Sequence, residues 1–389
     1  MRPAWLEVNL DSLAHNFALL RSKAPASQLV GIVKANAYGH GAVPVGRELL
    51  RLGAWGLAVA TASEGRELRR GGIQGRVLLM GSLHPDQARE VLEADLIASL
   101  STLEGAQALD AAARASGKIA EVHLEFDTGM GRVGFQWDEA ARVKEALEQF
   151  PNLKVTGLYS HFADAEENLE FTRMQLANFR QVREVWGPGY FCHLSNSAGV
   201  FNYPEASFRR ESRVASFRGD SRVAAFDAIR PGIALYGLLP DLGLKPIARL
   251  LAKPTLVKQL PPGRKIGYGG LYTTQGHEWI ATLPVGYADG MPRLLYNRAT
   301  VRLPRLSQGG LVCPVVGRIS MDQITVRIPG PVDLDTVFEV VTADFDPGSS
   351  LWGWAEMTGT VSYEPAVRLA VRLPRVYVRG GVEVARIEP

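Results

Sequence analysis

The chain has 389 residues, of which 46% are hydrophobic and 21% charged, the composition of an ordinary folded protein with a sizeable core. Its formal net charge of +3 invites a nucleic-acid partner, but residues 207–224 alone hold five arginines against one glutamate and one aspartate, which accounts for the whole excess. A phosphate-binding surface needs a broader basic stripe, so we expect no nucleic-acid partner.

The cysteines and the N-terminus indicate the compartment. Cys192 and Cys313 are the two cysteines, and without a C-x-x-C spacing we expect neither a disulfide framework nor a metal site. The N-terminus alternates like a strand and carries Glu7 and Asp11, unlike a secretory signal. No apolar run approaches the roughly 18 residues of a membrane span. We expect a cytoplasmic protein without membrane association.

Up to about residue 237, eight short apolar runs alternate with helical patterns. The strand candidates are residues 28–34, 54–60, 76–81, 96–100, 119–126, 155–160, 191–195 and 229–237. Several stretches between them carry apolar residues at three- and four-residue spacing, as amphipathic helices do. Eight strand-then-helix units predict an α/β fold whose first domain, residues 1–237, is a TIM-type (β/α)₈ barrel.

After residue 238 the helical pattern fades. Short strand candidates stand between Pro/Gly turns at residues 251–260, 278–285, 299–303, 310–316, 322–328, 337–343 and 375–387, with one helical patch at 349–372. We therefore predict a mostly β C-terminal domain over residues 238–389.

One internal repeat is present, because SFRRESRVA at 207–215 is followed at once by SFRGDSRVA at 216–224. We interpret it as a tandem duplication in a surface loop. The alternative, a contact arm, has only the arginines in its favour.

The first strand candidate ends in GIVKANAYGHG, where Lys34 follows an apolar run. In (β/α)₈ enzymes the carboxyl ends of the strands hold the active site. Lys34 is either a solvated lysine or a partly desolvated amine able to form a Schiff base. Asn36, Tyr38 and His40 could anchor a polar ligand, and we expect Asn36 and His40 to shape the turn.

Other polar clusters follow later strand candidates. Arg132 in FDTGMGR is either a surface residue of a β-turn or an arginine aimed into the barrel mouth to bind a carboxylate or phenolate. His161 alone could be structural or catalytic. A phosphate site late in the barrel is suggested by Asn196, Ser197, Arg230, Gly232 and Ile233. In the β domain Tyr268 lies between glycines, with Tyr287, Met321 and Asp322 further along.

Eight segments, in order along almost the whole chain, resemble the alanine racemases, which are pyridoxal-phosphate enzymes built from a barrel and a β domain. The segments are VKANAYGHG, HLEFDTGMGRVGF, HLSNSAG, IRPGIALYG, KIGYGG, LPVGYADGMPR, VGRISMDQ and the SYE around Tyr363. The resemblance implies racemisation of L-alanine and D-alanine, which supplies D-alanine for peptidoglycan synthesis. It also implies a homodimer whose subunits share their active sites.

By this resemblance Lys34 carries pyridoxal 5'-phosphate and acts as the base on one face of the substrate. Tyr268, delivered from the other subunit, acts on the opposite face. A tyrosine with a pKa near 10 needs help to act as a base, and the resemblance assigns that help to His161, which links Tyr268 to Arg230. Arg230 would meet the pyridine nitrogen and, being unable to give up its proton readily, would keep the electron sink weak.

The remaining roles are implied in the same way. The residues assigned to the cofactor's phosphate and its surroundings are Tyr38, Asn196, Ser197, Gly232, Ile233 and Tyr363. Arg132 would meet the cofactor's phenolic oxygen and the substrate carboxylate. The backbone N–H of Met321, from the partner chain, would complete the carboxylate site, and Tyr287 would narrow its opening.

One position departs from the family pattern. Much of the family has a carbamylated lysine before the F-D-T-G-M-G-R turn, whereas this chain has Glu125. Glutamate is also an anionic oxygen pair, on a shorter stem. We hypothesise that Glu125 orients Arg132 without carbon dioxide, because a buried arginine needs an anion.

Three other functions compete with alanine racemisation. A broader-specificity amino-acid racemase stays open, since the sequence does not fix substrate size. A pyridoxal-phosphate decarboxylase on a similar barrel needs an acidic residue at the ring nitrogen, which Arg230 argues against. A cofactor carrier built on the barrel alone would have no use for Tyr268 and Met321.

Overall fold

The fold is described from a computed structural model that covers residues 2–202, 226–303 and 310–389. The repeat at 207–224, predicted as a surface loop, lies outside the described residues. By compactness the chain forms two units. We call Phe17–Ala35 with Gly46–Gly232 the barrel unit, and Met1–Asn16 with Asn36–Val45 and Ile233–Pro389 the sheet unit.

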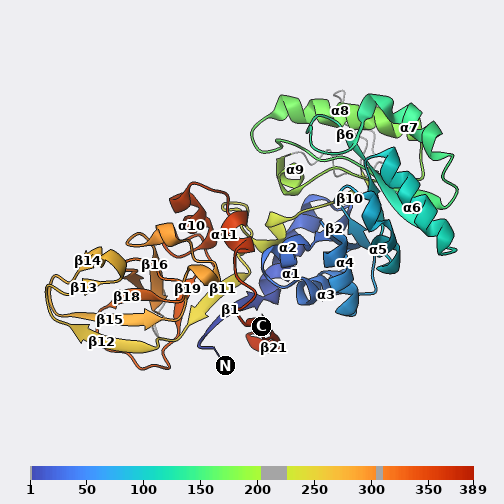
Figure 1. The fold of residues 1–389 in the computed structure, drawn as a ribbon. Coiled ribbons are helices and arrows are strands. Elements are labelled where there is room, and N and C mark those ends of the chain that lie inside the picture. Colours follow the sequence, from blue (N-terminus) through green and yellow to red (C-terminus); the bar gives the residue numbers. More distant parts are fainter. Residues whose placement is uncertain (1, 203–225, 304–309) are drawn as a thin grey trace. The chain divides into compact units, whose positions relative to one another are not determined.

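In its described part, the barrel unit contains eight parallel strands that pair in chain order (Figure 1). They are β2 (Gln28–Ile32), β3 (Gly56–Val59), β4 (Val77–Leu79), β5 (Ala98–Leu100), β6 (Ala120–Asp127), β8 (Leu153–Tyr159), β9 (Phe191–His193) and β10 (Ala228–Ile229). β10 pairs with β2, and a single bridge between Leu78 and Ile97 joins β4 to the start of β5. This nearly closed barrel confirms the predicted fold class.

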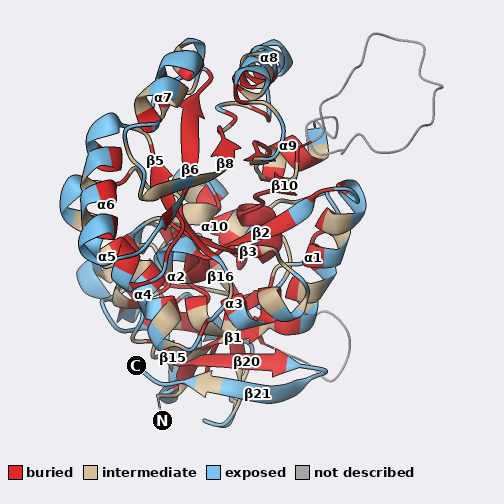
Figure 2. Cartoon of the chain, turned by 90° about the vertical axis from the view of Figure 1, so that its right-hand side faces the viewer, coloured by how far each residue is buried: buried red, intermediate tan, exposed pale blue. Residues whose placement is uncertain are grey.

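Burial explains why these runs form strands. Every residue of β3, β4 and β5 is buried, as expected of parallel strands covered by helices. Figure 2 shows the helices α5, α6 and α7 buried toward the strands and exposed on the outside. The short strand β7 (Phe135–Gln136) pairs with the end of β6.

Helices flank these strands along the chain. They are α1 (Leu10–Lys23), α2 (Lys34–Tyr38), α3 (Ala42–Arg51), α4 (Ala62–Arg70), α5 (Ala88–Glu93), α6 (Leu103–Ala115), α7 (Ala140–Leu147), α8 (Leu169–Trp186) and α9 (Ser197–Asn202), with 3₁₀ turns η1 (Pro85–Gln87) and η2 (Trp137–Glu139). α4 begins with a capping box, in which the side chain of Thr61 accepts from the N–H of Glu64 while the Glu64 carboxylate accepts from that of Thr61.

The sheet unit is built on a seven-stranded sheet. Its order is β17 (Leu311–Pro314), β16 (Thr300–Leu303), β19 (Phe338–Val341), β11 (Ala248–Ala252), β1 (Ala4–Asn9), β20 (Arg375–Arg379) and β21 (Val382–Ile387). A three-stranded sheet of β12 (Leu256–Leu260), β15 (Glu278–Leu283) and β18 (Ile324–Ile328) and the pair β13 (Lys265–Ile266) and β14 (Tyr272–Thr273) complete it. The predicted helical patch forms α10 (Leu351–Thr358) and α11 (Tyr363–Val367).

The N-terminal strand joins this sheet and not the barrel. β1 runs antiparallel to β11 and parallel to β20, with its residues alternating between buried and partly exposed positions. The alternation follows from the two faces of one sheet strand.

The eighth strand candidate, 229–237, is mostly wrong as a strand. Only Ala228–Ile229 pairs in the barrel, and Ile233–Tyr236 forms the buried 3₁₀ turn η4. Pro231 has no N–H to donate to a strand ladder, so pairing ends there. The continuous apolar character of the segment reflects burial of a turn.

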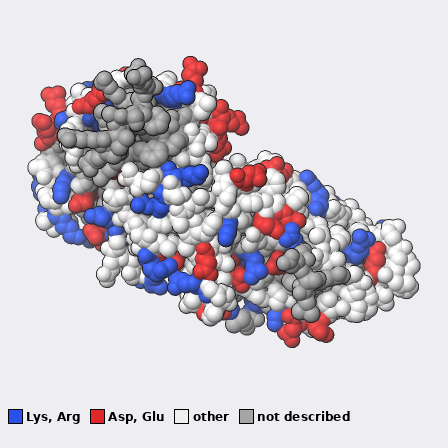
Figure 3. Space-filling model, turned by 180° about the vertical axis from the view of Figure 1, so that it is seen from behind, with Lys and Arg blue, Asp and Glu red and all other residues white. Residues whose placement is uncertain are grey.

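None of the described helices is long and apolar enough to cross a membrane. On the face drawn in Figure 3, Lys and Arg side chains are interspersed with Asp and Glu.

Candidate active site

The segment after β2 is a short left-handed helix. Ala35, Asn36, Ala37 and Tyr38 all have φ between 51° and 53°. Left-handed backbone costs an L-residue roughly 1–2 kcal/mol, so four in succession persist only where surrounding contacts hold them. Such strain is concentrated at functional sites, and here it begins directly after Lys34.

Asn36 and His40 hold this turn, as predicted. The C=O of Asn36 accepts from the N–H of Gly41 at 2.9 Å, and its side-chain oxygen accepts from the N–H of Ala42 at 2.8 Å. His40 contacts the C=O of Ala37 through both its backbone N–H (3.0 Å) and its ring Nδ1 (2.9 Å). Both residues are therefore committed to the backbone of the turn.

Strand β20 fastens the same turn from the side. Arg375 Nε donates to the C=O of Gly39 at 3.0 Å, and the Tyr377 hydroxyl donates to the C=O of His40 at 2.9 Å. Gly41 has φ +99°, and a Cβ there would lie 1.8 Å from the Tyr377 hydroxyl. Glycine at this position is thus required by both backbone angle and space.

Lys34 itself is exposed, and its neighbours in the barrel unit affect its amine. The protein atoms around it and the positive charge of Arg132 lower the pKa of Lys34, while Glu64 opposes the shift. Glu64 also accepts from the N–H of Ala35 at 2.7 Å, so the cap of α4 anchors the start of the left-handed turn. A lowered pKa favours the neutral, nucleophilic amine.

Arg132 lies on a loop shaped by Asp127 at the end of β6. The Asp127 carboxylate accepts from the N–H groups of Gly129 at 2.9 Å and Gly131 at 2.9 Å. Arg132 is exposed and has no hydrogen bond or ion pair among the described residues, yet its charge lowers the pKa values of both Lys34 and His161. The loop therefore presents an uncommitted guanidinium close to Lys34.

Arg230 is buried in the barrel, where histidines and carbonyl groups surround it. Its terminal nitrogens bond His193 Nδ1 at 2.6 Å, the C=O of Ser160 at 2.6 Å and His161 Nδ1 at 3.1 Å. Its Nε is buried and has no hydrogen-bond partner among the described residues. Burial lowers the pKa of Arg230 to about 10, against the opposing charges of Tyr159 and Glu125.

These contacts decide the tautomers of the histidines. A guanidinium only donates, so the Nδ1 atoms of His193 and His161 must accept and their protons sit on Nε2. His193 Nε2–H then donates to His123 Nδ1 at 2.9 Å. Burial, followed by the charge of Arg230, lowers the pKa of each of these three histidines, so they are neutral at pH 7.

Glu125 faces Tyr159. The Tyr159 hydroxyl donates to Glu125 Oε2 at 2.9 Å, its ring lies 5.1 Å from the guanidinium of Arg230, and it stacks on His193 with centroids 4.8 Å apart. Among the described residues Glu125 forms no ion pair with Arg132. Burial raises the pKa of Glu125, against the Tyr159 hydrogen bond and the charges of Arg230 and Arg132. Glu125 thus acts on the arginines through space and through Tyr159.

The predicted phosphate residues fall in both units. In the barrel unit the N–H of Gly232 donates to the Ser197 hydroxyl at 3.0 Å, and Asn196 caps α9 by accepting from the N–H of Gly199 at 2.9 Å. In the sheet unit the Tyr38 ring lies 6.2 Å from that of Tyr363. Ile233 is buried in η4 of that unit.

The residues predicted to act in a partner's site are exposed. Tyr268, Met321 and Tyr287 expose 71%, 52% and 41% of their surface. Tyr268 begins the 3₁₀ turn η5 (Tyr268–Gly270), directly after Gly267. The C=O of Met321 is held by the N–H of Ala288 at 3.0 Å, whereas its own N–H has no acceptor among the described residues.

Two family models match the chain: the N-terminal domain of alanine racemase over residues 8–240, and the C-terminal domain of alanine racemase over residues 247–377. The chain belongs to the alanine racemase family. It is therefore an isomerase, and racemisation of alanine is the reaction that this membership supports.

Relatives match at full length. The alanine racemase of Clostridium novyi is 37% identical over 403 residues, covering 100% of this chain and 98% of the relative. That of Symbiobacterium thermophilum is 39% identical over 390 residues, covering 97% of each. Among solved structures, alanine racemase of Clostridium difficile 630 superposes with a TM-score of 0.87 at 31% identity, covering 100% of this chain and 99% of that one.

Sequence reasoning missed several residues that hold the candidate groups in place. Tyr159 and His193 are polar residues in buried barrel strands, and Arg375 and Tyr377 lie two apart on one face of β20. Polar side chains at alternating positions of an otherwise apolar strand were the available signal. Which of them contact Arg230 or the left-handed turn depends on strand pairing.

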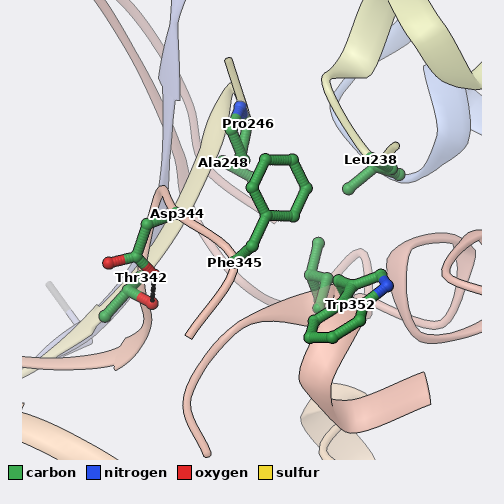
Figure 4. A pocket seen from close by; sticks show the side chains of 8 residues that line it. Leu238, Pro246, Ala248, Thr342, Asp344, Phe345 and Trp352 are labelled. Carbon is green, nitrogen blue, oxygen red and sulfur yellow. Dashed lines mark hydrogen bonds between the residues drawn. The ribbon is translucent and has the colours of Figure 1, made fainter. Parts of the chain in front are cut away.

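A hollow in the sheet unit is lined by other residues. Its lining is Leu238, Pro246, Ala248, Thr342, Asp344, Phe345, Leu351 and Trp352. Figure 4 shows that its polar side chains, Thr342 and Asp344, hydrogen-bond each other, at 2.6 Å. With apolar walls and polar groups already paired, it is a gap in packing and not a ligand site.

Proposed function

We propose that the chain racemises L-alanine and D-alanine with pyridoxal 5'-phosphate held on Lys34, and so supplies D-alanine for cell-wall synthesis. The observation that carries the cofactor assignment is the buried Nε–H of Arg230, which lacks an acceptor among the described residues. Buried donors are nearly always paired, and a pyridine nitrogen is an acceptor of the right kind. The residues therefore fit the cofactor.

Arg230 also bears on the type of reaction. When bound, pyridoxal phosphate supplies an electron sink for the pair left behind by the α-proton. A guanidinium held by His193, Ser160 and His161 keeps its own protons, so it leaves the ring nitrogen unprotonated and the sink weak. A weak sink favours prompt return of the proton over loss of carbon dioxide, which supports a racemase over a decarboxylase.

Lys34 and Tyr268 are the proposed bases on the two faces of the substrate. The lowered pKa of Lys34 increases the fraction of neutral amine that can take a proton. For Tyr268 the help comes from His161, whose Nδ1 accepts from Arg230 and whose Nε2 therefore carries a hydrogen to donate. A donor of this kind stabilises a phenolate and makes the tyrosine a better base.

We assign the substrate carboxylate to Arg132 and to the N–H of Met321, with Tyr287 narrowing the opening. Both carboxylate donors lack a protein partner among the described residues, as groups kept for a ligand should. Around the cofactor's phosphate we place Tyr38, Ser197, Gly232, Ile233 and Tyr363, with Asn196 supporting Ser197 through the α9 cap.

The active species is proposed to be a homodimer. Residues 238–389, as the C-terminal domain, would carry Tyr268 and Met321 to the site of the other subunit. The support is their exposure of 71% and 52% in a single chain, which a second copy would cover. Sedimentation analysis tests this, since an active monomer would contradict it.

Glu125 is proposed to replace the family's carbamylated lysine by electrostatics. It is 4% exposed, and Arg132 and Arg230 both act on its pKa. Its carboxylate accepts a hydrogen bond from Tyr159, so we propose that it balances the charges of the two arginines without bonding Arg132 directly.

Exchange in D₂O tests the proposed activity. The purified protein, supplied with pyridoxal phosphate, is mixed with L-alanine, and the α-proton signal and optical rotation are followed together. We expect exchange with loss of rotation. Release of carbon dioxide would identify a decarboxylase. A protein that neither exchanges the α-proton nor releases carbon dioxide would be a carrier. The same assay with serine and larger amino acids measures substrate breadth. The cellular role is tested by producing the protein in a bacterium that requires D-alanine and asking whether it then grows without added D-alanine.

A further inference from the structure

A buried carboxylate in the sheet unit accepts several hydrogen bonds, and no role has been assigned to it above. Asp289, in the 3₁₀ turn η6 (Tyr287–Asp289), has a fully buried side chain. It accepts from both terminal nitrogens of Arg2, at 2.6 and 2.7 Å, and from Arg372 Nε at 2.8 Å. The backbone N–H of Gly286 donates to it as well, at 3.0 Å. Four donors leave this carboxylate little freedom to move.

Arg372 extends the contact to a second loop. One of its two terminal nitrogens donates to Asp322 Oδ1 at 2.8 Å. Asp322 follows Met321 directly, and Asp289 follows Tyr287 by two residues. One guanidinium therefore ties together the loop that carries Tyr287 and the loop that carries Met321. A planar guanidinium can serve two carboxylates at fixed angles, which an ammonium cannot.

The backbones of these two loops are also in direct contact. The N–H of Tyr287 donates to the C=O of Ser320 at 3.1 Å, and the N–H of Ala288 donates to that of Met321 at 3.0 Å. A Cβ built on Gly286 would lie 2.3 Å from the Met321 oxygen. With no space for a side chain between the loops, a shift of one moves the other.

We propose that Asp289 and Arg372 form a positioning clamp that fixes the Met321 N–H and the Tyr287 ring for the substrate carboxylate. Arg2 adds a second guanidinium to Asp289 and also donates to the C=O of Pro284 at 2.9 Å. The inference rests on the roles proposed above for Met321 and Tyr287. Neither Asp289 nor Arg372 touches substrate in this scheme; they act through the loops.

The test compares Asp289→Asn with the wild type in two independent measurements. The first is KM and kcat for alanine, with the inhibition constant of propionate, which has the carboxylate and methyl groups of alanine without the amine. We expect KM and the propionate constant each to rise on the order of tenfold, because small misplacements of binding groups have effects of this size or larger, while kcat changes less than about threefold. The second is hydrogen exchange at residues 284–291 and 318–323, which should become faster.

Asp346→Asn is the matched control. Asp346 also pairs with an arginine, Arg302 at 2.9 Å, and also accepts from backbone N–H groups of the sheet unit, but it bonds neither loop of the clamp. Arg372→Lys keeps the positive charge but not the planar guanidinium, so it should show a smaller effect of the same kind as Asp289→Asn. If Asp289→Asn does not fold, Arg372→Lys decides, with a rise in KM of about threefold expected.

The outcomes separate the clamp from the proposed function. A wild type that fails to racemise alanine would refute the function, while the exchange measurement would still judge the clamp. A folded Asp289→Asn protein with unchanged exchange in both loops, or one whose KM rises no more than that of Asp346→Asn, would overturn the clamp.

Discussion

The barrel unit and the sheet unit differ in how far they bury the residues that we propose to function. In the barrel unit Arg230 is 2% exposed and held by two histidines and two carbonyls, so its direction is fixed before any ligand arrives. In the sheet unit Tyr268 is 71% exposed and stands on a glycine-flanked turn. The barrel unit thus fixes Arg230 before any ligand binds, whereas the sheet unit leaves Tyr268 exposed, as its proposed role in a partner's site requires.

The largest expected effect is on the lysine of the barrel unit. Lys34→Ala should lower alanine racemisation by about 10⁴-fold or more, because it removes a base together with the cofactor's attachment. The cofactor's absorbance when bound should be lost as well. Lys258→Ala, at an exposed position of β12, is the control and should keep both. A Lys34→Ala protein with the wild-type absorbance would refute the assignment.

Tyr268→Phe probes the sheet unit. We expect racemisation to fall by about 10²–10⁴-fold, the usual contribution of a positioned acid or base. The melting temperature should change little, because the substitution removes only a hydroxyl and the side chain packs little within its own chain. Exchange of the α-proton in D₂O should persist for one enantiomer, through Lys34. Equal loss of exchange for both enantiomers would contradict a two-base mechanism.

Acid should affect the barrel unit first. Burial lowers the pKa of His123 to about 3 and the pKa values of His161 and His193 well below the ordinary 6.5. Below pH 6.5 the unfolded chain takes up protons at these sites and the folded chain does not, so each site removes up to about 1.4 kcal/mol of stability per pH unit. When the pH is lowered from 7 to 5, the protection of backbone amides against hydrogen exchange, taken relative to the intrinsic rate at each pH, should fall in β8 and β9 before it falls in β20.

His193→Asn should reduce this acid sensitivity. A melting temperature that stays constant from pH 7 to pH 5 would show that these histidines are not buried as neutral rings.

The smallest effect, on Glu125, distinguishes function from stability. Burial raises the pKa of Glu125, so the folded chain holds its proton more tightly and loses stability as pH rises from about 4.5 through the folded pKa. Glu125→Gln removes this pH dependence and should melt higher than the wild type above that range. It should also raise KM for alanine about tenfold, since a charged hydrogen-bonded group contributes about 1.4 kcal/mol. Unchanged kinetics would remove the orienting role.

Much of the fold was predictable because its signals are local. Seven of the eight apolar runs assigned to the barrel form its strands, and most strands after residue 238 lie in the predicted runs. The run at 251–260 spans the end of β11 and all of β12, and β13 and β14 were not predicted. The segment at 229–237 misled because an apolar buried turn and an apolar buried strand have the same composition. The placement of β1 beside β11 and β20 was not predictable, since pairing partners more than 200 residues away leave no signal in a strand of six residues.

By itself the sequence determined the order of strands and helices, the family and the residue types that could handle a cofactor and a proton, because these depend on local pattern and motif. Only the tertiary structure decided which of these side chains already have hydrogen-bond partners within the protein. Asn36 and His40 hydrogen-bond within a left-handed turn, and Glu125 accepts a hydrogen bond from Tyr159. Arg230 fixes the proton of His161 on Nε2, and its own Nε has no partner among the described residues. Hydrogen bonding and burial are set by neighbours in space, and those neighbours come from distant parts of the chain.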